Sequence, residues 1–365
     1  MNNDMQALFQ ETLGYLLAPV QTLLADEAVT EIMINGASEI FAERAGRIER
    51  TKLVFPDAAA LEAAARGIAQ FSGKRLTADQ LSVEARLPDG SRVHIVQPPA
   101  ARKGLSMAIR KFSKSKLGLA DLVKRNALTE ESAAFLTAAV RIRKNIIVSG
   151  GTGSGKTTLL NCLSAQIPSY ERILVIEDTA ELQLQQDHVV QLEAQQPDRF
   201  GQNGISIREL FRASLRMRPD RILVGECRGG EALDMIQAMT SGHAGSPSTC
   251  HADTPNDTLA RLEVMCLMSG VELPLMALRA QVGSAVQLIV QVGRQADGSR
   301  RITEIAQVRG IDENHRYVID NLFRLTPGTA GPSLVWSGVK PTFAETVSAD
   351  PTLGELVRAS ARLWS

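Results

Sequence analysis

The chain has 365 residues, which is long enough for two domains and a sizeable core. Apolar residues make up 44% of it, as is typical of a globular protein, and this composition excludes extended disorder. Lysine plus arginine and aspartate plus glutamate number 40 each, so the basic excess expected of a protein dominated by nucleic-acid binding is missing.

Residues 1–112 are predicted to form an N-terminal α+β domain. Leucines recur with helical spacing up to about residue 25, and short alternating segments with Asn-Gly and Ala-Gly turns follow. The alanine-rich stretch AALEAAARGIAQFSG predicts a helix that ends at Gly73, and VEARLPDGSRVHIVQPP predicts a hairpin that turns at Asp89-Gly90. The polar and basic stretch 113–128 is predicted to be a flexible linker.

Residues 129–325 are predicted to form a second, α/β domain. Helical patterns alternate there with the β-rich segments NIIVSG, RILVIED, RILVGE, GSPSTCHA and AVQLIVQV, which indicates a mostly parallel sheet flanked by helices. Residues 326–365 are rich in proline and glycine at first, and we expect a tail that packs on the surface of this domain and ends in a short helix.

The sequence also bears on localisation. The N-terminus has acids and no basic region, so we expect no signal peptide. No apolar run approaches the roughly 20 residues of a membrane-spanning helix. The four cysteines form no CxxC pair, which favours reduced, mostly buried thiols over a zinc site or a disulfide. We therefore expect a cytoplasmic protein that reaches a membrane only through partners.

The segment IIVSGGTGSGKTTLL contains a phosphate-binding loop. The pattern GxxxxGK[ST] is matched in full, between a predicted strand and a predicted helix, by Gly150, Gly151, Thr152, Gly153, Ser154, Gly155, Lys156 and Thr157, with Thr158 next. Backbone N–H groups in such a loop converge on phosphate oxygens, and the start of the helix adds its positive dipole end. We expect Lys156 to neutralise β/γ-phosphate charge of ATP and Thr157 to hold Mg²⁺.

Two predicted strands end in acids. RILVGE ends in Glu226, a candidate general base that polarises the attacking water, and RILVIED ends in Glu177 and Asp178, which can position the water or Mg²⁺, with the metal contact direct or through water. The alternative is that these acids cap elements or pair with surface arginines.

Histidines and arginines complete the candidate site. His243 and His251 lie eight residues apart in SGHAGSPSTCHAD, a spacing that matches no helix face, and no third metal ligand is obvious. We therefore expect γ-phosphate sensing from a neighbouring strand or loop rather than metal binding. Basic side chains that can stabilise phosphoryl oxygens, in some proteins from a second subunit, are Arg110, Arg212, Arg216, Arg218, Arg221 and Arg228. The alternative for each arginine is a structural ion pair.

Several long motifs in order resemble the secretion ATPase superfamily, and most closely the CpaF-type ATPase of tight-adherence (Tad) pili. They are LPDGSRVH, AIRKF, RKNIIVSGGTGSGKTTLLN, ERILVIEDTAELQL, LRMRPDRILVGECRGGEALDMIQAMTSGHAGS, STCHADTPNDTLARLE and ADGSRRITEIAQVRG. The resemblance implies a RecA-like ATPase domain, an N-terminal domain, a homohexameric ring and ATP held between the domains.

The resemblance also implies roles for individual residues. It places Glu177 and Asp178 in the family's Asp box, Glu226 in Walker B and the two histidines in the His box. It places Arg110 near the nucleotide and Arg216, Arg218 and Arg228 at basic positions of the Walker B block. The chain departs from the family pattern at Gln195, where an arginine is usual, and at Pro247 and Asp253 in the His-box loop.

The function that follows is a Mg²⁺-dependent ATP hydrolase. As a motor it would power pilus assembly or secretion through inner-membrane platform proteins, with the chain peripheral at the inner membrane. The alternative is a type IV secretion traffic ATPase that exports DNA or protein. A nucleotide-gated scaffold without turnover is disfavoured by Glu226 and Glu177, and a DNA motor by the neutral charge.

Overall fold

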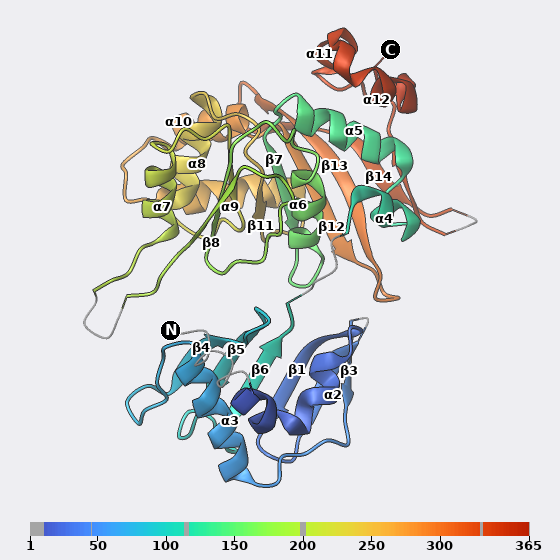
Figure 1. The fold of residues 1–365 in the computed structure, drawn as a ribbon. Coiled ribbons are helices and arrows are strands. Elements are labelled where there is room, and N and C mark those ends of the chain that lie inside the picture. The colour runs from blue at the N-terminus through green and yellow to red at the C-terminus, as the bar shows by residue number, and fades with distance from the viewer. Residues whose placement is uncertain (1–10, 45, 113–116, 198–201, 329–330, 365) are drawn as a thin grey trace. The chain divides into compact units, whose positions relative to one another are not determined.

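The computed structural model describes residues 11–44, 46–112, 117–197, 202–328 and 331–364, in two compact units, Met1–Ser115 and Lys116–Ser365. The two units are considered separately below, and Figure 1 shows the elements of each. No helix in the described residues is long and apolar enough to cross a membrane.

The smaller unit is a six-stranded antiparallel sheet covered by helices. Its strand order is β3-β2-β1-β6-β5-β4. The strands are β1 (Val29–Asn35), β2 (Ile40–Arg44), β3 (Arg47–Arg50), β4 (Ser82–Arg86), β5 (Arg92–Val96) and β6 (Ser106–Arg110). The helices are a helical stretch at 11–16, η1 (Ala18–Val20), α2 (Gln21–Ala25) and α3 (Ala58–Phe71). Alternate strand residues such as Val93 and Ile95 pack on Leu61 and Ile68 of α3, so one face of the sheet is core.

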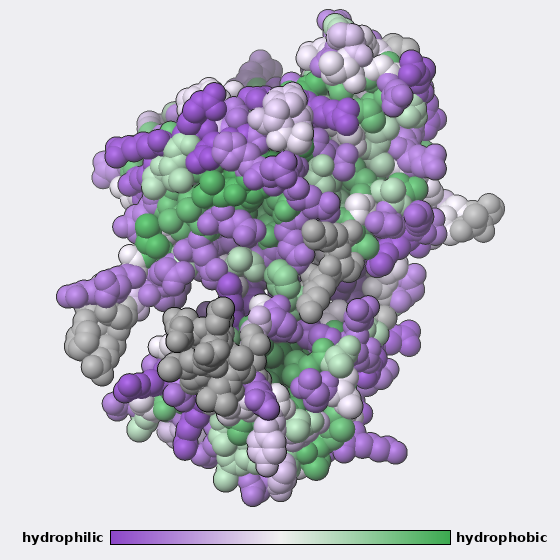
Figure 2. Space-filling model, in the orientation of Figure 1, coloured by the Kyte–Doolittle hydropathy of each residue, from purple (hydrophilic) through white to green (hydrophobic). Residues whose placement is uncertain are grey.

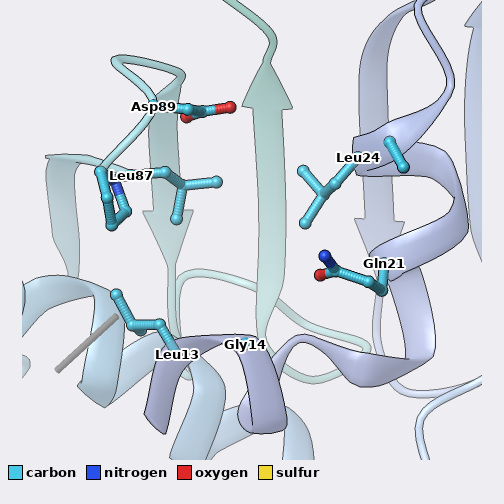
Figure 3. Close-up of a pocket in the computed structure, with 8 residues that line it drawn as sticks. Leu13, Gly14, Gln21, Leu24, Leu87 and Asp89 are labelled. Carbon is cyan, nitrogen blue, oxygen red and sulfur yellow. The ribbon is translucent and has the colours of Figure 1, made fainter. Parts of the chain in front are cut away.

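Two elements predicted for this unit, the helix that ends at Gly73 and the hairpin at Asp89-Gly90, are present. The helix α3 begins after Asp57, whose carboxylate accepts from Ala60 N at 2.7 Å, and ends just before Gly73, which has a φ of +70°. Strands β4 and β5 form the predicted hairpin with Gly90 at a φ of +89°. A shallow pocket lies between this turn and the first helices, lined by Leu13, Gly14, Gln21, Leu24, Ala25, Leu87, Pro88 and Asp89 (Figure 3).

The larger unit contains a nine-stranded sheet of order β15-β14-β13-β12-β7-β11-β10-β8-β9. Six strands are parallel: β7 (Ile146–Gly150), β8 (Ile173–Glu177), β9 (Val189–Glu193), β10 (Arg221–Val224), β11 (Ser248–Cys250) and β12 (Leu288–Arg294). The other three are antiparallel: β13 (Arg300–Ile311), β14 (Tyr317–Thr326) and β15 (Ser333–Trp336). The five predicted strands are all present, whereas β9 and the antiparallel extension were not anticipated.

Helices cover both faces of this sheet (Figure 1). One core contains Ile146 and Val148 of β7 with the helices α4 (Leu119–Lys124), α5 (Glu130–Arg141) and α6 (Lys156–Ser164). The other contains Ile147 with α7 (Ile207–Ser214), α8 (Glu231–Thr240), α9 (Pro255–Leu267) and α10 (Leu275–Ala285). Since successive strand residues point to opposite faces, the apolar run of β7 supplies both cores.

The chain ends in short helices that close the first core. These are α11 (Ala344–Ala349), η2 (Pro351–Leu353), α12 (Gly354–Ala359) and η3 (Ala361–Leu363). Trp364 stacks on Phe135 of α5 with ring centroids 5.7 Å apart.

The predicted linker 113–128 differs from the structure in part. Residues 113–116 lie outside the described residues, but α4 follows, and its Leu119 and Leu122 are buried in the larger unit. In the sequence these two leucines follow a stretch rich in lysine and serine, so the whole segment was predicted to be a polar linker.

Candidate nucleotide site

The phosphate loop joins the central strand β7 to α6. Gly150 has a φ of +158°, and a Cβ there would lie 2.6 Å from Ser154 Oγ, so only glycine fits against β12 and the loop. Gly155 has a φ of +99° at the N-cap of α6. Residues 151–153 are exposed at the tip, while Ser154 and Lys156 are buried. The predicted strand–loop–helix context of the motif is therefore present.

Lys156 is held by the loop itself. Its Nζ donates to Gly150 O at 3.0 Å and to Gly151 O at 2.9 Å, and it lies 3.3 Å from Nδ1 of His251. Since an ammonium only donates, Nδ1 accepts and the ring proton of neutral His251 sits on Nε2. Burial lowers the pKa of His251 most strongly, while the nearby Glu226 raises it; the net direction is down, which favours the neutral ring.

Glu226 follows β10 and is surrounded by cationic and polar groups. Its Oε2 accepts from Arg228 Nε at 2.7 Å and also pairs with Arg228 Nη2. Nε2 of His251 lies 2.6 Å from its Oε1, but the two groups are not aligned as a hydrogen bond. Arg228 Nη1 also lies 3.6 Å from Asp178. These contacts join Lys156, His251, Glu226, Arg228 and Asp178 in one line.

Glu177 occupies the last position of β8 and is buried. Its Oε1 accepts from Glu181 N at 2.9 Å and Leu182 N at 3.0 Å, so it caps the segment that follows the strand. Burial raises its pKa to about 7, against which these two hydrogen bonds act. Gly225 packs beside it, since a Cβ there would lie 2.8 Å from Glu177 Cγ. The carboxyl is thus placed one strand away from Glu226.

The parallel strands define two edges of the sheet. We call the edge at which they end the carboxyl edge, and the edge at which they begin the amino edge. The carboxyl edge collects the phosphate loop, Glu177, Asp178, Glu226, Arg228 and His251, as is general for ligand sites in open α/β sheets. Thr157 and Thr158 lie in the first turn of α6, both partly buried.

Three of the predicted site residues lie elsewhere in the larger unit. His243 precedes β11, and its neighbour Gly245 donates to Asn145 Oδ1 at 2.6 Å just before β7, so His243 is at the amino edge. Arg216 and Arg218 precede β10 at the same edge and are exposed. β11 therefore separates His243 from His251 within the chain, and a role of His243 in γ-phosphate sensing stays a prediction.

The other arginines differ in their partners and in their location. Arg110 ends β6 in the smaller unit. Arg212 pairs with Asp234 at 2.9 Å, and Arg221 is buried against Glu171, so both are structural ion pairs. Sequence reasoning missed Arg300 of β13, whose Nε donates to Gly153 O at 2.9 Å. Its only signal was the basic pair after the Asp-Gly turn at 297–298.

No group of three or more His, Cys, Asp or Glu side chains in the described residues could hold a metal ion alone. A hard cation at the carboxyl edge would need other ligands as well. Mg²⁺ suits such a place, because it typically takes one or two protein oxygens together with substrate phosphates and water.

Comparisons with known proteins agree with this geometry. A sequence profile described as "Type II/IV secretion system protein" matches residues 16–318. The type IV secretion system protein PtlH of Bordetella pertussis is 37% identical over 325 residues, covering 82% of this chain and 96% of PtlH. A putative conjugal transfer protein of Mycobacterium tuberculosis is 34% identical over 296 residues, covering 80% of this chain and 84% of that protein.

The fold is also found among solved structures. The ATPase DotB of Yersinia pseudotuberculosis superposes with a TM-score of 0.55 at 18% identity, covering 98% of this chain and 86% of DotB. The mixed α/β architecture with a RecA-like phosphate-loop unit is thus shared. The profile match and the two relatives show that this chain belongs to the type II/IV secretion system protein family.

Proposed function

We propose that this chain is the motor subunit of a secretion machine and that it couples hydrolysis of Mg²⁺-bound ATP to movement. The observation that carries the proposal is the line of contacts from Lys156 through His251 and Glu226 to Arg228. It links the lysine of the phosphate loop to an acid suited to activate water. A binding switch without turnover would not need that acid beside the loop.

Each group has a role when nucleotide binds. Phosphate oxygens replace the carbonyls of Gly150 and Gly151 as partners of Lys156. His251, released from Lys156, donates to the terminal phosphate. Glu226 accepts a proton from the attacking water once Arg228 moves away from its carboxylate. Arg228 is then available to a phosphoryl oxygen, with Asp178 as its alternative partner.

The residues present fit Mg²⁺. The hydroxyl of Thr157 and the carboxylate of Asp178 or Glu177, directly or through water, are oxygen donors of the kind this cation prefers. When bound, Mg²⁺ supplies neutralisation of phosphate charge.

We further propose a homohexamer, in which the exposed cations Arg216 and Arg218 of the amino edge, together with Arg110 of the smaller unit, act on nucleotide held by a neighbouring copy. Hydrophilic residues cover much of the face in Figure 2, with an apolar area over the region of α7 and α9. Exposed apolar side chains gather on α9, α10 and the turn between them: Val264, Leu267, Met268, Val271, Leu275 and Met276. Exposed apolar groups in this number support contact with another copy or with a platform protein.

Two kinds of machine are candidates for the one that this chain drives. The names of the similar proteins, type IV secretion and conjugal transfer, favour export of protein or DNA. The motifs HADTPNDTLARLE and ADGSRRITEI favour assembly of a Tad-type pilus. In both, the chain would act at the inner membrane through platform proteins.

The test compares wild type with Lys156→Ala and Glu226→Gln. We expect Lys156→Ala to lose ATP binding in calorimetry, because the variant lacks the ammonium that neutralises phosphate charge at the loop. Glu226→Gln should bind ATP and lose turnover by about 100-fold or more. Turnover at the wild-type rate in Glu226→Gln would exclude this acid as the base, and a fully active monomer in light scattering would exclude the ring.

A further inference from the structure

A buried polar cluster lies at the amino edge, away from the phosphate loop. Asn145, which directly precedes β7, forms hydrogen bonds there with both its amide nitrogen and its amide oxygen. Its Nδ2 donates to Ala285 O at 2.7 Å and to Met239 O at 3.3 Å, and its Oδ1 accepts from Gly245 N at 2.6 Å and Ser246 N at 3.3 Å. One amide therefore ties the ends of α8 and α10 to the loop before β11.

Arg221, the first residue of β10, holds the same loop from the other side. It is 1% exposed, and it pairs with Glu171, which is 2% exposed. Its Nη1 donates to Gly245 O at 3.0 Å and its Nη2 to Val140 O at 3.0 Å. Buried charges are costly unless all their partners are present, so this arrangement resists displacement of Gly245. Ser246 Oγ adds a bond from Ile222 N at 3.3 Å.

The strand that leaves this loop leads directly to the nucleotide site. Pro247 and the three residues of β11 lie between Ser246 and His251. Thr249 in its middle accepts from Cys227 N at 3.0 Å and donates through Oγ1 to Gly225 O at 2.7 Å. These two residues flank Glu226. A displacement of β11 along its axis would therefore move His251 and the backbone on both sides of Glu226.

We propose that the loop at Gly245 and Ser246, held by Asn145 and Arg221, acts through β11 to position the His251–Glu226 pair for ATP hydrolysis. This proposal rests on the proposed function of that pair. A strand of three residues has few ladder bonds of its own to fix its register, so its position depends on what holds its ends. The contacts of Asn145 and Arg221 with Gly245 and Ser246, which we call the clamp, fix one end of β11 at the amino edge. His251 follows the other end of β11 in the nucleotide site.

Two glycines of one loop allow a matched test. Both have positive φ, +79° at Gly245 and +100° at Gly242, so alanine strains the backbone at either position. A Cβ at Gly245 would lie 2.8 Å from Arg221 Cζ and 2.9 Å from Arg143 Cα, whereas a Cβ at Gly242 meets nothing within 4 Å. Gly245→Ala therefore displaces the clamp, and Gly242→Ala controls for backbone strain.

The experiment measures ATP turnover and ADP affinity in the full chain. We expect Gly245→Ala to lower kcat by about 10- to 100-fold, as a misplacement of about 1 Å does, with ADP affinity within about twofold of wild type. Gly242→Ala should keep a kcat close to wild type. Equal losses in the two variants, or a loss of ADP affinity as large as the loss of kcat, would overturn the proposal.

A double-mutant cycle separates positioning from general damage. If Gly245→Ala acts through the His251–Glu226 pair, most of its effect on kcat should disappear in a His251→Gln background. The same fold loss in both backgrounds would overturn the proposal while leaving the motor function intact. Absence of turnover in the wild type would instead refute the proposed function.

A milder variant covers the case in which Gly245→Ala does not fold. Ser246→Ala removes the bonds of Ser246 Oγ to Ile222 N and to His243 O, the latter 2.7 Å long, and adds no atoms. We expect a smaller loss of kcat that is again largely absent with His251→Gln. An additive loss in that background contradicts positioning through β11.

Discussion

The two edges of the parallel sheet are built in opposite ways. At the carboxyl edge the charged groups Arg228 and Asp178 are partly exposed, and Lys156 rests on backbone carbonyls that a phosphate can replace. At the amino edge Arg221, Glu171 and Asn145 are buried, with their polar groups fully engaged by fixed partners. The difference teaches that this protein separates the interactions that must change during turnover from those that hold its strands in register.

The largest effect on stability is expected at the amino edge. Arg221→Met keeps the bulk of the side chain but leaves Glu171 with only Arg143, whose Nη2 lies 3.3 Å from its Oε1. Removing one partner of a buried ion pair costs about 3–5 kcal/mol. Urea unfolding measures this loss. A change below about 1 kcal/mol would mean that the two edges do not differ in the way described.

A second prediction concerns the buried acid of the carboxyl edge. The folded pKa of Glu177, about 7, lies above its ordinary 4.5, so the folded chain holds this proton more tightly than the unfolded chain. Stability from the group is fully present below about pH 4.5 and is lost as the pH rises through 7, by about 3 kcal/mol in total.

Glu177→Gln keeps an oxygen for Glu181 N and Leu182 N but cannot ionise. We therefore expect the free energy of unfolding of this variant to fall less than that of wild type between pH 5 and pH 8. Parallel pH profiles for the two proteins would contradict a raised pKa at this position.

The smallest effect on stability is expected for the matched arginine of the carboxyl edge. Arg228→Met removes ion pairs to Glu226 and Asp178 in which Arg228 is exposed, and this should change the free energy of unfolding by about 1 kcal/mol or less. Turnover should nevertheless fall by about 10-fold or more, because the same guanidinium serves the phosphoryl group. A stability loss equal to that of Arg221→Met would erase the contrast between the edges.

The sequence predicted the carboxyl edge better than the amino edge, for physical reasons. The phosphate loop needs glycines and a lysine at fixed spacing, and the acids follow apolar strands, so local patterns sufficed for Lys156 and Glu226. The clamp joins residues far apart in the chain, and Arg221 looked like the exposed arginines just before it. The separation of His243 from His251 could not be foreseen, because spacing along the chain does not show that a strand lies between them.

The tryptophans offer a consequence of the packing at the chain end. The sequence has two, and both belong to the C-terminal segment: Trp364 stacks on Phe135, and Trp336 lies on β15 with the guanidinium carbon of Arg362 5.4 Å from its ring centroid. Intrinsic tryptophan fluorescence therefore monitors the contact between the terminal helices and α5, which we call the seam. A shift in emission when nucleotide is added would report motion carried through α5 to that seam, without any attached dye.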